Sequence, residues 1–104
     1  MLTKKLFKHL SVLLIIMKTY FIEMLPITNI CSDFEIIACD ENDLFRKLFI
    51  LHVLNYNSVE EFEEFENAPY SLLDPLKCKE TFLVHSKVIS ILNKTDNKFV
   101  LSYF

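Results

Sequence analysis

The sequence predicts a single α+β domain over residues 1–104, in which three to four helices pack on a small sheet that ends in a C-terminal β-hairpin. The length of 104 residues suits one hydrophobic core and leaves no room for two. Hydrophobic residues make up 52% of the chain, which argues against disorder. Near residue 86, helical spacing of the apolar residues gives way to β-branched and aromatic runs. These features together predict a mixture of helix and sheet.

The first element expected is an apolar N-terminal helix over residues 3–25, within a segment 1–25 that precedes the body of the domain. Apolar side chains recur there every three to four residues, and Pro26 ends the helix. Further apolar side chains lie off this stripe, so the helix would be buried on two faces, in its own fold or against a partner. Lys18 and Glu23 interrupt the run, so we expect no membrane span, and no cleavage site for a signal peptide follows.

The body of the domain, residues 26–104, is expected to continue as strand, helix, helix and hairpin. Residues 27–31 are a short strand candidate, and residues 32–39 are ambiguous between a strand and a helical turn. Asp40 or Asn42 can then cap a helix with acidic residues in its first turn and a clear apolar stripe.

Two further helices and the hairpin complete the chain. Ser58 and the glutamate three residues later match a capping box, which opens a short acidic helix to about residue 67. Asp74 followed by proline is a typical start of a helix, here running to about residue 85. Residues 87–92 and 99–104 are the two strands of the hairpin, joined by a loop of about six residues.

The composition excludes several classes of function. The chain contains no glycine, so glycine-rich phosphate loops are absent and turns that need a positive φ must use Asn or Asp. Its three histidines and three cysteines contain no pair at the spacing of zinc ligands, so we expect no metal and no cofactor. The odd number of cysteines and the lack of a C-x-x-C motif predict reduced thiols. The glutamates of the acidic helix are expected to face solvent rather than to serve catalysis.

Two groups of lysines are candidates for contact with phosphate. One group lies in the last helix, the segment after it and the hairpin loop, and consists of Lys77, Lys79, Lys87, Lys94 and Lys98. The other group precedes the apolar run and consists of Lys4, Lys5 and Lys8. For the second group, an ordinary charged helix end is an equally good interpretation.

Three segments of the chain carry a family resemblance: residues 28–32 (Thr-Asn-Ile-Cys-Ser), residues 45–53, and residues 91–104, which end in Leu-Ser-Tyr-Phe. In order, they resemble the first strand, the first helix and the final hairpin of the eukaryotic large-subunit ribosomal protein twenty-two (L-twenty-two-e) family, whose hairpin closes on a similar Leu-x-Tyr-Phe. The chain departs from the family in the short acidic stretch 57–70, in the few lysines of its last helix and in its apolar N-terminus.

The resemblance implies a non-enzymatic structural constituent of the large ribosomal subunit in the cytoplasm. Its partners would be ribosomal RNA and neighbouring ribosomal proteins, and the lysines would neutralise phosphates with little reading of bases. The alternative is a protein-binding adaptor or regulatory subunit that docks through the apolar helix at 3–25. An enzyme that uses a cysteine nucleophile is the least favoured reading, because no residue that would lower a thiol pKa lies near the cysteines in sequence.

Overall fold

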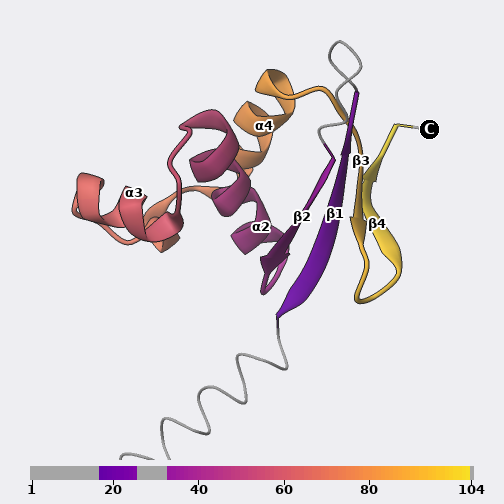
Figure 1. The fold of residues 1–104 in the computed structure, drawn as a ribbon, viewed down its shortest axis with the longest axis horizontal. Coiled ribbons are helices and arrows are strands. Elements are labelled where there is room, and N and C mark those ends of the chain that lie inside the picture. Colours follow the sequence, from indigo (N-terminus) through magenta and orange to yellow (C-terminus); the bar gives the residue numbers. More distant parts are fainter. Residues whose placement is uncertain (1–16, 26–32, 104) are drawn as a thin grey trace, which may run out of the picture.

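The computed structural model describes residues 17–25 and 33–103. These residues form a four-stranded antiparallel sheet with its helices on one side (Figure 1). The elements follow in the order β1 (Lys18–Met24), β2 (Phe34–Ala38), α2 (Glu41–Leu48), the π-helix η1 (Phe49–Val53), α3 (Val59–Glu66), the 3-10 helix η2 (Tyr70–Leu72), α4 (Pro75–His85), β3 (Val88–Asn93) and β4 (Lys98–Ser102).

The strands are arranged in the order β2-β1-β3-β4, with β1 and β3 in the centre. Both neighbours of β1 are antiparallel to it, so β2 and β3 are parallel to each other with β1 between them. Parallel strands cannot be joined by a tight turn, and here the whole helical segment forms the connection from β2 to β3. This crossover places α2 and α4 against a single face of the sheet (Figure 1).

The core lies between that face and the two helices. Tyr20 and Ile22 of β1 and Ile91 of β3 contribute from the sheet, and none of the three is more than 1% exposed. The fully buried Leu44 and Leu48 of α2 and the fully buried Phe82 of α4 close the core from the other side. One continuous cluster of buried side chains joins the sheet to both helices, which confirms the predicted α+β domain.

Local capping explains where the helices begin. The side chain of Asp40 accepts a hydrogen bond from the backbone N–H of Asp43 at 2.8 Å, which caps α2. Ser58 caps α3 through the N–H of Glu61 at 3.0 Å, as the capping box predicted. Asp74 caps α4 immediately before its N-terminal proline. The three helices predicted downstream of residue 40 are therefore confirmed.

Asparagine adopts the left-handed backbone conformation at turns of this chain, which contains no glycine. Asn55, Asn67 and Asn97 have φ values of 61°, 53° and 52°. Asn67 ends α3, and Asn97 lies in the β3–β4 turn. Asparagine tolerates this region better than other residues with a Cβ atom. The prediction that asparagine occupies positions with a positive φ, where glycine is more usual, is confirmed at these three residues.

The prediction of a helix over residues 3–25 is wrong where the structure can test it. Lys18–Met24 is strand β1, and it pairs with both β2 and β3. Tyr20 and Ile22 are buried while Phe21 between them is not, which is the two-residue period of a strand. Pairing on both sides outweighed the helical spacing of the apolar residues. Residues 3–16 and the predicted strand at 27–31 lie outside the described ranges.

Two smaller expectations are settled as well. The ambiguous residues 32–39 contain the strand β2, which forms one edge of the sheet. The hairpin is confirmed, but its strands extend to Asn93 and Lys98, so the connecting turn is shorter than the six residues expected. Among the described residues, no helix is long and apolar enough to cross a membrane.

Candidate RNA interface

The turn between β3 and β4 is fixed against the start of β1. Asn93 accepts a hydrogen bond from the backbone N–H of Asp96 at 2.9 Å and donates its amide to the Asp96 carboxylate at 3.1 Å. Lys18 forms an ion pair with the same carboxylate at 2.5 Å, and this hydrogen bond holds the pKa of Asp96 below its ordinary value. The hydroxyl of Thr95 accepts from the N–H of Thr19 at 2.9 Å. The turn is therefore held in one conformation by side chains from both segments.

Two of the predicted RNA-binding lysines, Lys94 and Lys98, lie at this end of the sheet. Lys94 forms an ion pair with Glu35 of β2 at 2.5 Å, and each of the two side chains is 49% exposed. Lys98 is exposed and opposes Asn93 in the register of the hairpin. Half-exposed surface pairs contribute little to stability, because water and salt screen them. The Lys94 ammonium can therefore exchange Glu35 for another anion at small cost.

Lys87 is separated from this pair by the length of β3. It directly precedes Val88, and its carbonyl accepts a hydrogen bond from the N–H of Leu25 at 2.8 Å. The six residues of β3 place Lys87 about 20 Å from the turn. The short distance in sequence between Lys87 and Lys94 does not bring them together in space.

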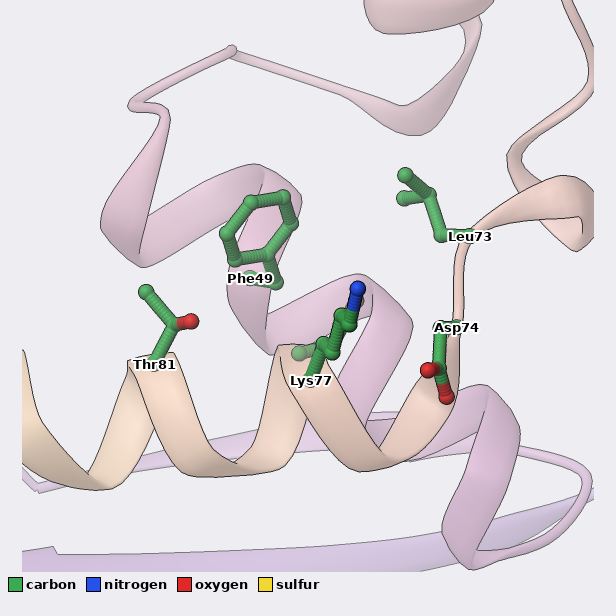
Figure 2. A pocket seen from close by; sticks show the side chains of 6 residues that line it. Phe49, Leu73, Asp74, Lys77 and Thr81 are labelled. Carbon is green, nitrogen blue, oxygen red and sulfur yellow. The ribbon is translucent and has the colours of Figure 1, made fainter.

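The two lysines of α4 occupy a third location. The ammonium of Lys79 lies 5.3 Å from the centre of the Phe45 ring, in a cation–π contact. Lys77 lies at a pocket between α4 and η1 (Figure 2). The five lysines predicted from the second half of the chain thus form three separate groups rather than one surface. Lys4, Lys5 and Lys8 lie outside the described residues.

Sequence reasoning missed the face of the sheet that points away from the helices, which we call the open face. Phe21 of β1 pairs with Leu92 of β3, and Leu92 pairs with Phe99 of β4, so the three side chains form a row across three strands. Phe21 and Leu92 are partly exposed, and Phe99 is 57% exposed. No helix of the described residues covers this row (Figure 1). Alternation along residues 18–24 was the signal that could have revealed it.

The charges around the open face are nearly balanced. Glu35 stands at the β2 end of the row, opposite Phe21, where Lys94 neutralises it. In the adjacent row the hydroxyl of Ser90 donates to the carboxylate of Glu23 at 3.2 Å. The acidic helix α3 lies on the other side of the molecule, beyond α2 (Figure 1). The most negative segment is therefore remote from the open face.

A buried carboxylate on the helix side has a structural role. Asp43 is 5% exposed and accepts hydrogen bonds from the N–H of Cys39 at 2.9 Å and from the hydroxyl of Tyr70, with the ammonium of Lys47 at 3.2 Å. Burial alone would raise the pKa of Asp43, but these donors together hold it below its ordinary value. Burial and Asp43 raise the pKa of the Tyr70 hydroxyl. The network ties the segment after β2 to the segment after α3.

The thiols and possible metal ligands show no activated arrangement among the described residues. Cys39 and Cys78 are free thiols. Burial raises the pKa of both, and Asp43 adds to this effect at Cys39, which lowers the fraction of nucleophilic thiolate. In residues 17–25 and 33–103, no three side chains of His, Cys, Asp or Glu gather as metal ligands would.

Comparison with protein-family models, curated proteins and solved structures finds no match to this chain. Membership of the ribosomal protein family therefore stays a prediction that rests on the three segments of sequence.

Proposed function

We propose that this protein is a non-enzymatic constituent of the cytosolic large ribosomal subunit that binds unpaired ribosomal RNA on its open face. Bases would stack on the row formed by Phe21, Leu92 and Phe99. Lys94 and Lys98 would neutralise phosphates at the turn end of the same sheet. Residues 91–104, which resemble the ribosomal family, include Phe99 and Lys98 of β4 and Lys94 of the turn before it.

The observation that carries this proposal is the placement of two phenylalanines on a sheet face that no described helix covers, at the end of the sheet where Lys94 and Lys98 lie. A base stacked on an aromatic side chain contributes about 1–3 kcal/mol, and the contact tolerates any base. Four-stranded sheets with exposed aromatic residues are one of the recurrent surfaces for single-stranded RNA. The net charge of −3 opposes RNA binding, but the separation of α3 from the open face reduces that opposition locally.

Lys94 would change partner when RNA binds. Its ion pair with Glu35 occupies the ammonium in the free protein. A phosphate that approaches the turn offers a competing anion, and each lysine–phosphate contact releases a condensed counterion from the RNA. Glu35 would then face solvent at the edge strand β2, where it is exposed. This exchange predicts weaker salt dependence than that of a strongly basic ribosomal protein.

Sedimentation of the tagged chain with salt-washed ribosomes tests the proposal. We expect the wild-type chain in the fractions of the large subunit, and we expect Phe99→Ala to shift a large part of it to the top of the gradient. Phe65→Ala is the matched control, because Phe65 is 77% exposed on the remote helix α3. Wild-type protein found only at the top of the gradient would reject the ribosomal assignment.

A protein-binding adaptor is the second candidate, although the docking helix predicted for it is wrong over residues 18–24. Residues 18–24 now belong to a central strand, so a partner cannot bind them as a helix. The observation that favours this candidate is the exposure of Phe65, Leu72 and Leu76, at 77%, 75% and 61%, on α3, η2 and α4. Cross-linking in cells that depends on Phe65 and not on Phe99 would support the adaptor over the RNA-binding subunit.

A further inference from the structure

A shallow pocket of about 300 Å³ opens between η1 and the first turns of α4, and the proposed RNA contact does not use it. Figure 2 shows the side chains that line it. They come from η1, from the link between η2 and α4, and from α4: Phe49, Leu73, Asp74, Lys77, Cys78 and Thr81. The volume lies at the lower end of the range for sites that bind small molecules.

The walls of the pocket are apolar and held in place. Phe49 and Leu73 are partly buried and pack against the hydrophobic core, and the thiol-bearing Cys78 is only 3% exposed. The guanidinium of Arg46 donates to the carbonyl of Leu73 at 2.8 Å, which fixes the segment that carries one wall. A ligand would therefore meet a preformed apolar surface and would not have to order it first.

The polar groups of the pocket favour an anion. Lys77 and Thr81 are four residues apart on α4 and so lie on the same face of the helix. In Figure 2 the ammonium of Lys77 extends toward the space between Phe49 and Leu73. The ion pairs among the described residues use Lys18, Lys47 and Lys94, and Lys77 is exposed.

Asp74 competes little with such an anion, because its carboxylate caps the helix. It accepts a hydrogen bond from the N–H of Leu76 at 3.1 Å, and in Figure 2 its oxygens point away from Phe49 and Leu73. One ammonium and one hydroxyl can satisfy a carboxylate head group. A phosphate dianion would keep uncompensated charge beside the apolar walls, which is unfavourable.

We propose that this pocket binds a small carboxylic acid with an apolar body. The apolar body lies between Phe49 and Leu73 above Cys78, and the carboxylate accepts hydrogen bonds from the ammonium of Lys77 and the hydroxyl of Thr81. In this proposal Lys77 binds the carboxylate of the ligand, a role different from the phosphate contacts proposed for Lys94 and Lys98. It does not depend on RNA binding, since the pocket and the open face lie on different layers of the fold.

Titration of the ¹⁵N-labelled full chain with three probes, followed by NMR, tests the assignment. The probes are 3-phenylpropionate, its uncharged analogue 3-phenylpropanol, and propionate, which lacks the apolar body. We expect 3-phenylpropionate to shift the amides of Phe49, Leu73 and Thr81 in a saturable manner and to bind about fivefold or more tightly than either other probe. Equal affinity for 3-phenylpropanol would overturn the role of the anion.

Two substitutions separate the ammonium from general effects on folding. Lys77→Gln should weaken binding of 3-phenylpropionate about fivefold and leave 3-phenylpropanol unchanged. Lys79→Gln, two residues further along α4 and over the Phe45 ring, should leave both affinities unchanged. Equal losses in the two variants, or no saturable binding of 3-phenylpropionate by the wild type below about 10 mM, would overturn the proposal.

Discussion

The two faces of the same sheet differ in what covers them. Tyr20, Ile22 and Ile91 on the helix face are at most 1% exposed, whereas Phe99 on the open face is 57% exposed. Consecutive residues of one strand therefore divide between the core and an available surface. The difference teaches that the effect of a substitution depends on which face of the sheet the side chain lies on: truncation on the helix face costs stability, whereas Phe99 on the open face can be truncated at small cost.

Truncation of a side chain on the helix face should have the largest effect. Ile22→Ala leaves a cavity at a fully buried site in the central strand β1. We expect the free energy of unfolding to fall by about 2–5 kcal/mol. Urea denaturation followed by circular dichroism measures this loss. Phe99→Ala in the same assay should cost less than about 1 kcal/mol, because the side chain is more than half exposed. Equal losses from the two variants would contradict the division between faces.

The Asp43 network should produce the next largest effect, and its sign follows from the pKa. The pKa of Asp43 in the folded protein is lower than its ordinary value of 3.8, so the ionised form stabilises the fold. That contribution is complete above pH 3.8 and is lost as the pH falls through the lower folded pKa. Asp43→Asn should reduce the free energy of unfolding by about 1–3 kcal/mol at neutral pH.

Denaturation of wild type and Asp43→Asn across a pH series checks this prediction. The difference between the two proteins should shrink as the pH falls from about 4 through the lower folded pKa, because the carboxyl takes up a proton first in the unfolded chain and only then in the folded protein. Tyr70→Phe, which removes one donor to Asp43, should show a smaller loss in the same window. A difference that stays constant down to the lowest pH would show that the charge of Asp43 contributes nothing.

The lysines at the turn should change salt dependence more than stability. Changing both Lys94 and Lys98 to Ala should lower the slope of log affinity against log salt by about 1–2 for a single-stranded ribosomal RNA fragment. Preference among RNA sequences should not change, since phosphate contacts carry no sequence information. Filter binding across a salt series measures the slope. The matched control changes Lys79 on α4 and Lys87 at the far end of β3 to Ala. An equal change of slope in both double variants would contradict RNA contact through the hairpin turn.

Local signals predicted the helical layer well. Asp40, Ser58 and Asp74 each place a side-chain oxygen at the start of a helix. Each oxygen accepts a hydrogen bond from a backbone N–H fewer than four residues away, so the helix start can be recognised from a short stretch of sequence. The hairpin was also predictable, because its two strands are adjacent in sequence. Its turn is tighter than expected because Asn97 adopts a positive φ that lets the strands pair up to Lys98.

The central strand could not be predicted in the same way. Its identity depends on β2 and β3, and the partner of Tyr20 in β3 is Asn93, at the other end of the chain. Helical spacing in the N-terminal segment and strand alternation in residues 18–24 coexist in one sequence, and only pairing decides between them. The open face includes this strand, so a predicted helix over residues 3–25 excludes the open face from any prediction made from the sequence. The prediction that Lys87 and Lys94 share one surface is wrong for a related reason. The two residues are close in sequence, but the strand β3 separates them in space.

The most direct test of RNA binding on the open face compares two phenylalanines of similar exposure. Phe99 lies in the row on the sheet and Phe65 lies on α3, at 57% and 77% exposure. Filter binding to a single-stranded fragment of large-subunit ribosomal RNA, at one fixed salt concentration, should show about a tenfold loss of affinity for Phe99→Ala. Phe65→Ala should bind as the wild type does. An unchanged affinity in Phe99→Ala, or an equal loss in both variants, would contradict the proposal that RNA stacks on this face.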